Sequence, residues 1–358
     1  MKYPTHQHPS RERGLSMIEL LVSLVIGVVL VLGATQLYVD SRNSYGVNEA
    51  VARLQETARY ALSVVEPDVR MGNSFGLIKG ASLITGKAAQ TVAAAAVAPA
   101  AANVCGTNFA VDLNTTVQAD NNGYVLSASR GAGCNTLSGW TTTPVTSADT
   151  LTIRRASTAN TVSTASRLQI CSTRTTARLY SDGSACAATP AGQVNDLVVH
   201  AYYVDRNSEQ QVGMPSLRRK SLVSTGGAIQ FIDQEVMAGV EDLQVQFGVE
   251  AGTTGIATRY VNPDALPAVL AAGGQVVAVR LWLLVRADAP EGGFVDGRIY
   301  EYGDRLQGNG ITSDLNAASA ATRAFQPSQS ADNSFTSIKG YRRLLVSRTI
   351  QLRNALGT

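Results

Sequence analysis

The sequence predicts an α+β fold: one long N-terminal helix, transmembrane in its first half and amphipathic in its second, packed on an antiparallel β-sheet head. Three observations predict it. A near-continuous apolar stretch at residues 15–37 passes into helical periodicity without an intervening loop. Apolar residues take every second position within residues 243–249 and 276–286, which is typical of half-buried antiparallel strands. A long amphipathic helix needs such a sheet to cover its apolar stripe.

Residues 15–37 form the expected membrane-spanning half of the helix. Glu19 is the one charged residue among these 23, and about 20 apolar residues suffice to cross a bilayer core as a helix. The tail before it, residues 1–14, carries three cations against one anion: Lys2, Arg11 and Arg13 against Glu12. This basic excess predicts that the tail stays in the cytoplasm and that the rest of the chain is exported.

Glu19 and Gly14 do not fit an ordinary anchor or secretory signal. A carboxylate inside a membrane helix costs about 2.5–3.5 kcal/mol, so Glu19 is expected to have a partner or a function. The alternative is a residue at the helix edge whose carboxylate reaches water. A secretory signal places its small-residue cleavage site after the apolar run, whereas Gly14 lies before it, next to Arg13.

The stretch Gly14-Leu15-Ser16-Met17-Ile18-Glu19-Leu20 resembles a type IV prepilin leader. The resemblance implies that a prepilin peptidase removes residues 1–14 by cutting between Gly14 and Leu15, and that Leu15 is then N-methylated. Phenylalanine is commoner than leucine at that position in the family. The resemblance therefore supports cleavage more strongly than it supports methylation. The resemblance makes Glu19 an assembly residue, because a carboxylate and the freed α-amino group of a neighbouring helix neutralise each other where water is scarce.

The amphipathic half of the helix is expected over residues 38–72. Apolar residues recur there at steps of three and four, with charged residues between them: Val47, Ala50, Val51, Leu54, Ala58, Ala61, Leu62 and Val65. Pro67 is expected to end or kink the helix, with one more turn before Gly72. From Leu15 to Glu66 the helix would be about 78 Å long at about 1.5 Å per residue.

Residues 73–190 are expected to be a variable region rich in alanine and threonine. Ala88–Ala102 and Thr136–Ser166 are predicted as loops and short edge strands inserted in the head. The region holds all four cysteines, none in a C-x-x-C spacing: Cys105, Cys134, Cys171 and Cys186.

An even number of cysteines in an exported chain suggests disulfides. Pairing of sequence neighbours, Cys105–Cys134 and Cys171–Cys186, is favoured because each bridge would pin a loop that buries little apolar surface. Buried free thiols are the alternative.

Residues 191–358 are expected to form the β-rich C-terminal part of the head. Leu197–Val204 is a predicted strand, followed by a turn at residues 205–208 and short strands at 221–224 and 228–232. Alternating apolar residues predict three further strands: Leu243, Val245, Phe247 and Val249 in the first, residues 276–286 in the second, and Leu344, Val346, Ile350 and Leu352 in the third. Arg348 interrupts the apolar face of the last one.

The segments Gly239–Gly248, Val279–Arg286, Tyr341–Arg343 and Leu352–Asn354 resemble PilW-type minor pilins. The resemblance covers the N-terminal helix and much of residues 194–354, and its motifs are structural. It implies a low-abundance pilin that joins other minor pilins in a complex priming type IV pilus assembly, at the pilus tip. Type II secretion pseudopilins of the tip complex are the nearest competing assignment, and a tip adhesin or DNA receptor using residues 80–190 is another.

The expected partners follow from this resemblance: other minor pilins, the major pilin, the prepilin peptidase and methyltransferase, inner-membrane lipid and a tip adhesin. The expected location is the bacterial inner membrane, crossed once with the N-terminus cytoplasmic and the head periplasmic, and then the extracellular fimbrium.

No catalytic or metal site is predicted, so the chain is not expected to be an enzyme or to bind a cofactor. Its histidines are His6, His8 and His200, and the first two leave with the leader. His200, in a strand, is expected to be a packed or surface residue. Gly80–Ala88 lacks the spacing of a phosphate-binding loop, and Asp120–Gly123 lacks the carboxylates of a calcium loop. Both are predicted as turns.

Two basic clusters could contact DNA phosphates: Arg218-Arg219-Lys220, and Arg342-Arg343 with Arg348 and Arg353. Solvated charges that protect strand edges are the favoured interpretation. The chain carries +3 and residues 1–14 carry +2, so the mature chain would carry +1. Nucleic acid is therefore not an expected partner.

Overall fold

The computed structural model describes most of the chain outside its N-terminal tail and several internal segments. The described residues are 14, 16–87, 109–124, 126, 136–137, 140–141, 143–186, 192–225, 227–252, 254–315, 321–329 and 338–354. The chain divides into two compact units, residues 1–52 and residues 53–358. We call the second unit the head.

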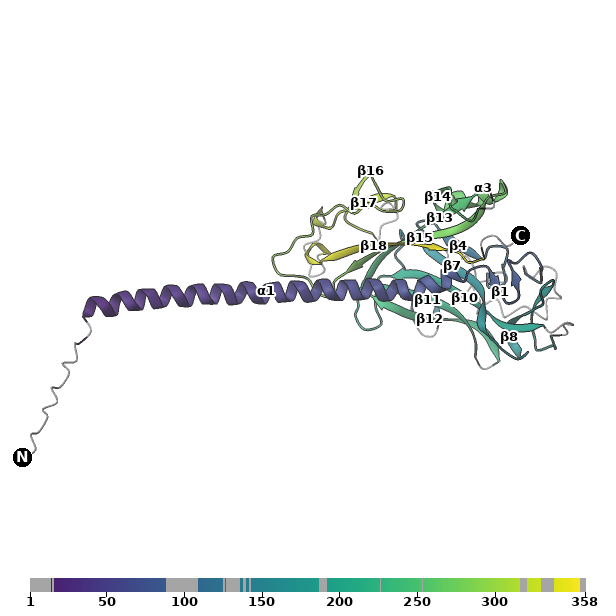
Figure 1. Cartoon of the computed structure of the whole chain (residues 1–358), viewed down its shortest axis with the longest axis horizontal. Helices are drawn as coiled ribbons and strands as arrows, with labels where there is room; N and C mark the ends of the chain where they lie inside the picture. Colours follow the sequence, from purple (N-terminus) through teal and green to yellow (C-terminus); the bar gives the residue numbers. More distant parts are fainter. Residues whose placement is uncertain are drawn as a thin grey trace, which may run out of the picture. The chain divides into compact units, whose positions relative to one another are not determined.

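Helix α1 (Met17–Arg70) is continuous over 54 residues (Figure 1). Pro67 lies in its last turn, and the helix ends one turn later, as expected. The amide of Gly72 donates to the carbonyl of Val69, and Asn73 adopts a left-handed φ of 65°, which stops the helix. Within the head, α1 buries one apolar stripe together with one carboxylate: Leu54, Ala58, Ala61, Val65, Asp68 and Val69.

A four-stranded antiparallel sheet packs on this stripe. Its strand order is β14 (Arg259–Val261), β13 (Val240–Glu250), β15 (Gln275–Arg286) and β18 (Arg343–Gln351). The predicted alternation is confirmed, since Leu243, Val245, Phe247 and Val249 are all buried. They share one core with the stripe of α1. The α+β fold predicted from the sequence is therefore confirmed.

An eight-stranded sheet forms the other large part of the head. Its strands are β3 (Ile84–Thr85), β4 (Val117–Asp120), β7 (Thr150–Asn160), β8 (Ala165–Ser172), β9 (Ala177–Asp182), β10 (Gln193–Asp205), β11 (Ser216–Thr225) and β12 (Ala228–Ala238). Strand β10 pairs with β11 along one side, and with β7 and β8 along the other. All pairs are antiparallel except β3 with β9.

The prediction of loops and edge strands for residues 136–166 is wrong where β7 lies. This strand pairs with β10 on one side and β4 on the other, and it buries Leu151 and Ile153. Threonine is β-branched and favours strands. The sequence Thr150-Leu151-Thr152-Ile153 also alternates as a half-buried strand does. The high threonine content therefore led to a wrong prediction of loops at this strand.

Smaller elements complete the head. They are β1 (Ser74–Phe75), β2 (Ile78–Lys79), β5 (Thr136–Leu137), β6 (Trp140–Thr141), η3 (Pro263–Ala265), α3 (Leu266–Ala271), β16 (Leu306–Thr312), β17 (Arg323–Phe325), η5 (Pro327–Gln329) and η6 (Ile338–Gly340). The turn between β1 and β2 requires glycine at Gly76, where φ is +72° and a Cβ would lie 2.4 Å from the Ser172 hydroxyl. This turn holds Phe75 and Ile78 in a second core with Ile170 and Leu197.

Candidate assembly site

The start of α1 holds the residues predicted for cleavage and assembly. Ser16 and Glu19 form a reciprocal cap: the Ser16 amide donates to Glu19 Oε2 (3.1 Å) and the Glu19 amide donates to Ser16 Oγ (3.2 Å). Gly14 is exposed and precedes the helix. Leu15 lies outside the described residues. The structure thus places Glu19 in the first helical turn, directly after the predicted cut.

The following turns of α1 present apolar side chains on all sides. All large apolar side chains from Met17 to Leu37 are at least half exposed; Met17 is 91% exposed and Leu37 is 72% exposed. By length and composition α1 can cross a membrane, and none of its most apolar window is buried. Such a surface needs lipid or other apolar helices around it. The helix start therefore fits a membrane anchor.

Asp68, near the other end of α1, is the ionic centre of the helix–sheet contact in the head. Its Oδ1 accepts from Arg155 Nη2 on β7 (2.7 Å). Its Oδ2 meets His200 Nδ1 on β10 (2.5 Å) and accepts from the Tyr202 hydroxyl. His200 is thus a packed residue, one of the two roles expected for it. The sequence analysis missed Asp68, whose only signal is a carboxylate within the apolar periodicity of α1.

The surroundings of Asp68 favour its charged form. Burial by itself would raise the pKa of this carboxyl group. The hydrogen bond and charge of His200, the Tyr202 hydroxyl and the Arg155 guanidinium outweigh burial and hold the pKa of Asp68 well below its ordinary value. The carboxylate is therefore ionised in the folded head at any pH near neutrality.

Two of the three residues of the first basic cluster, Arg218 and Lys220, are buried and Arg219 is half-buried, so the prediction of solvated edge charges is wrong for those two. Arg218 and Lys220 are fully inaccessible. Arg218 Nε donates to Asp233 Oδ1 (2.6 Å), and Lys220 Nζ lies 3.5 Å from Asp233 Oδ2. Asp233 and Glu235 on β12 stand directly across from Lys220 and Arg218 on β11. This matched spacing of opposite charges on consecutive strands was the signal in the sequence.

The second cluster is divided between interior and surface. Arg343 is buried, and its Nε donates to Glu241 Oε2 (2.6 Å). Arg342 pairs with Glu291, and Arg348 Nε lies 3.2 Å from Glu66 Oε2 on α1. Because carboxylates of the same chain already bind Arg218, Lys220, Arg342 and Arg343, the DNA-receptor alternative loses most of the phosphate contacts that suggested it.

A disulfide joins Cys171 on β8 to Cys186, with Cα atoms 5.6 Å apart. This is one of the two sequence-adjacent pairs favoured from the sequence. Cys105 and Cys134 lie outside the described residues.

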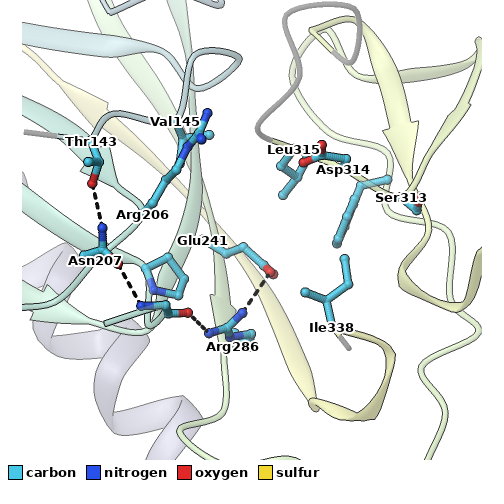
Figure 2. Close-up of a pocket in the computed structure, with 13 residues that line it drawn as sticks. Thr143, Val145, Arg206, Asn207, Glu241, Arg286, Ser313, Asp314, Leu315 and Ile338 are labelled. Atoms are coloured by element: carbon cyan, nitrogen blue, oxygen red, sulfur yellow. Dashed lines mark hydrogen bonds and ion pairs between the residues drawn. The ribbon is translucent and has the colours of Figure 1, made fainter. Parts of the chain in front are cut away.

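A cavity of about 620 Å³, lined by both polar and apolar residues, lies in the head near the end of β15. Figure 2 shows a series of hydrogen bonds and an ion pair that connect residues lining this cavity. Asn207 donates to Thr143 Oγ1 (2.8 Å) and accepts from the Gly213 amide, and the Gly213 carbonyl accepts from Arg286 Nη2 (2.8 Å). Arg286 Nη1 also lies 3.8 Å from Glu241 Oε1. No histidine, cysteine or lysine is among the described residues of the lining.

Metal binding finds no support in the part of the chain that the structure describes, where no group of three or more histidine, cysteine or acidic residues could hold an ion. The predicted turn at Asp120–Gly123 is present, and Asn122 in it bonds Asp149 and Asp304.

Comparison with protein families supports a pilin. The family model described as type IV pilus-assembly protein W matches residues 201–354, and the prokaryotic N-terminal methylation motif matches residues 9–35. The chain belongs to the PilW-type minor pilins. The pilin motif match spans Gly14, Leu15 and Glu19, and the PilW match spans the C-terminal end of β10 and all of β11 to β18.

The families matched by this PilW-type pilin are structural proteins. A search of curated proteins found no match. Among solved structures, a type IV-like pilin from Thermus thermophilus is similar at 16% identity and a TM-score of 0.27, over 61% of this chain and 82% of that chain.

Proposed function

We propose that this pilin primes type IV pilus assembly at the pilus tip, after prepilin peptidase cuts between Gly14 and Leu15. The observation that carries the proposal is the pairing of the methylation-motif match over residues 9–35 with an apolar helix start that the head does not cover. Cleavage there would free the α-amino group of Leu15, two residues before α1 begins at Met17, and Glu19 lies in the first turn of that helix.

The proposed mechanism has two stages. The uncut chain lies in the inner membrane, with its N-terminus in the cytoplasm and its head in the periplasm. After cleavage and N-methylation of Leu15, the apolar half of α1 packs laterally against the helices of other pilins. Glu19 then neutralises the N-terminal amine of a neighbouring helix, because an unpaired charge in an apolar bundle costs several kcal/mol, on the order of the insertion scales.

The partners in this proposal are other minor pilins and the major pilin, after the prepilin peptidase and methyltransferase have acted. The match to the PilW family model supports an interaction with other pilins in a pilus. A tip adhesin would join them on the exposed end of the complex.

Two substitutions separate the stages. Gly14→Ala is expected to block processing, so that the chain stays at its full length in the membrane fraction. Glu19→Ala is expected to allow processing but to reduce the chain in sheared pili severalfold. Glu56→Ala is the matched control, since Glu56 is an exposed carboxylate of the same helix outside the apolar segment. Normal incorporation of the Glu19→Ala chain into pili would contradict the proposed role of Glu19.

A further inference from the structure

Strand β18 is an open edge of the four-stranded sheet. It is the last strand in the order β14-β13-β15-β18. Figure 1 labels it and draws it in yellow. It pairs with β15 over nine residues, from Arg343 opposite Arg286 to Gln351 opposite Ala278, without a register shift. Among the described residues, no further strand pairs with the other side of this regular, unbulged stretch.

The hydrogen bonds at the ends of β18 show which of its main-chain groups point outward. The Leu352 amide donates to Val277 O (2.9 Å) and the Arg342 carbonyl accepts from the Ala287 amide (2.9 Å), so the even-numbered residues bond toward β15. In an antiparallel pair the alternate residues direct both groups away from the neighbour. These residues are Leu345, Ser347, Thr349 and Gln351.

Contacts at both ends agree with this alternation. The Arg343 carbonyl accepts from Arg298 Nη2 (2.8 Å), and the Arg353 amide donates to Arg70 O on α1 (3.1 Å). Between them, no group of the described residues bonds the outward-pointing amides and carbonyls. Ser347 and Thr349 are exposed, and the strand contains neither proline nor lysine, the residues that commonly protect an edge.

A cationic groove runs beside this edge. It has a volume of about 830 Å³ and lies between the last turn of α1 and residues 347–353. Arg70, Arg348 and Arg353 line it together with a single carboxylate, Glu66, which pairs with both Arg70 and Arg348. Three guanidinium groups against one carboxylate leave the groove with a net charge of +2.

We propose that the free edge of β18 pairs with an extended, acidic strand of a partner pilin. The outward amides and carbonyls would bond the main chain of that strand, and its carboxylates would face the arginines of the groove. A second copy of this chain fits worse, because symmetric pairing of two β18 strands would bring Arg348 of each copy together. The inference rests on the proposed function, which supplies the partner pilins.

The test is site-specific photocrosslinking with the full-length chain in pilus-forming cells. Ser347→p-benzoylphenylalanine places the probe on the edge, and Val212→p-benzoylphenylalanine is the control at a position 88% exposed elsewhere in the head. A discrete adduct with another pilin is expected from position 347 and not from position 212. An adduct of two copies of this chain, or no adduct at position 347, would overturn the proposal.

A second substitution tests the main-chain pairing. In the Ser347 probe chain, Thr349→Pro removes an outward amide without breaking a bond to β15, and it should reduce the adduct about fivefold or more. Thr349→Val keeps the amide and should leave the adduct unchanged. Should Thr349→Pro lower protease resistance, Arg353→Glu at its exposed position replaces it, with the same loss expected from charge reversal. An adduct that neither Thr349→Pro nor Arg353→Glu reduces would overturn strand pairing.

The same samples distinguish this inference from the proposed function. A chain that starts at Leu15 and enters sheared pili, yet gives no adduct at position 347, contradicts only the pairing at β18. A chain that is never processed or incorporated contradicts the proposed function itself.

Discussion

Asp68 and Glu19 lie on one helix but differ in what surrounds them. Asp68 is buried and bonds Arg155, His200 and Tyr202, each from a strand of the eight-stranded sheet. Glu19 lies in an exposed apolar turn, and among the described residues its carboxylate bonds only the Ser16 amide three residues away.

The difference separates folding from assembly. The partners of Asp68 are all in its own head, so its charge serves the stability of that head. Local capping leaves Glu19 with acceptor capacity for a donor from outside the chain, because an ionised carboxylate has about four lone-pair sites. The free energy of unfolding tests this separation.

Asp68→Ala should destabilise the head most. It leaves the Arg155 guanidinium, 15% exposed, without its carboxylate, and removal of one partner from a buried pair costs about 3–5 kcal/mol. Denaturant unfolding of the full chain in detergent measures the loss. Glu66→Ala is the control, since its partner Arg348 is half exposed and the expected cost is below about 1 kcal/mol. Equal effects of the two substitutions would contradict the assigned role of Asp68.

Reduction of the Cys171–Cys186 disulfide should have the next largest effect. The bridge closes a segment of 15 residues, for which loop-closure entropy gives about 3 kcal/mol. Unfolding with and without reductant measures it. A chain with Cys105→Ser and Cys134→Ser keeps the Cys171–Cys186 bridge and should still lose this free energy of unfolding on reduction. Unchanged stability of that chain on reduction would contradict the stabilisation assigned to Cys171–Cys186.

The contribution of Asp68 should depend on pH with a defined sign. Its pKa is lower in the folded head than the unfolded value of about 3.9, so its contribution is complete above that value and is lost as pH falls through the folded pKa. The stability difference between the natural chain and Asp68→Asn should therefore be constant near neutrality and shrink in acid. A difference that grows below pH 4 would show that burial, not pairing, sets the pKa of Asp68.

Glu19→Ala should leave the unfolding free energy of the head unchanged, within about 0.5 kcal/mol as for surface substitutions. The reason is that the described contacts of its carboxylate are confined to the first turn of α1. The measurement is the same denaturant titration, monitored by a signal from the head. A loss comparable to that of Asp68→Ala would remove the distinction between the two carboxylates.

Much of the fold could be predicted from the periodicity of apolar residues. The buried charged residues could not be predicted in this way. Leu243 to Val249 alternate because one face meets the core and the other does not, so β13 could be predicted. Arg218 and Lys220 looked like surface residues because the predicted strands, 221–224 and 228–232, were too short to include them or the carboxylates across from them on β12. The start of α1 could be predicted because its order of charge, glycine, apolar run and carboxylate is local. The β18 edge could not, because an open edge depends on the strand order of the whole sheet.

The central claim is that this chain is a pilin processed at Gly14. The most direct test is the intact mass and N-terminal peptide of the protein recovered from membranes and from sheared pili. We expect a chain that begins at N-methylated Leu15 and that is present in the sheared fraction. A chain that still begins at Met1, in cells whose prepilin peptidase is active, would contradict the claim and reduce the N-terminal segment to a plain membrane anchor.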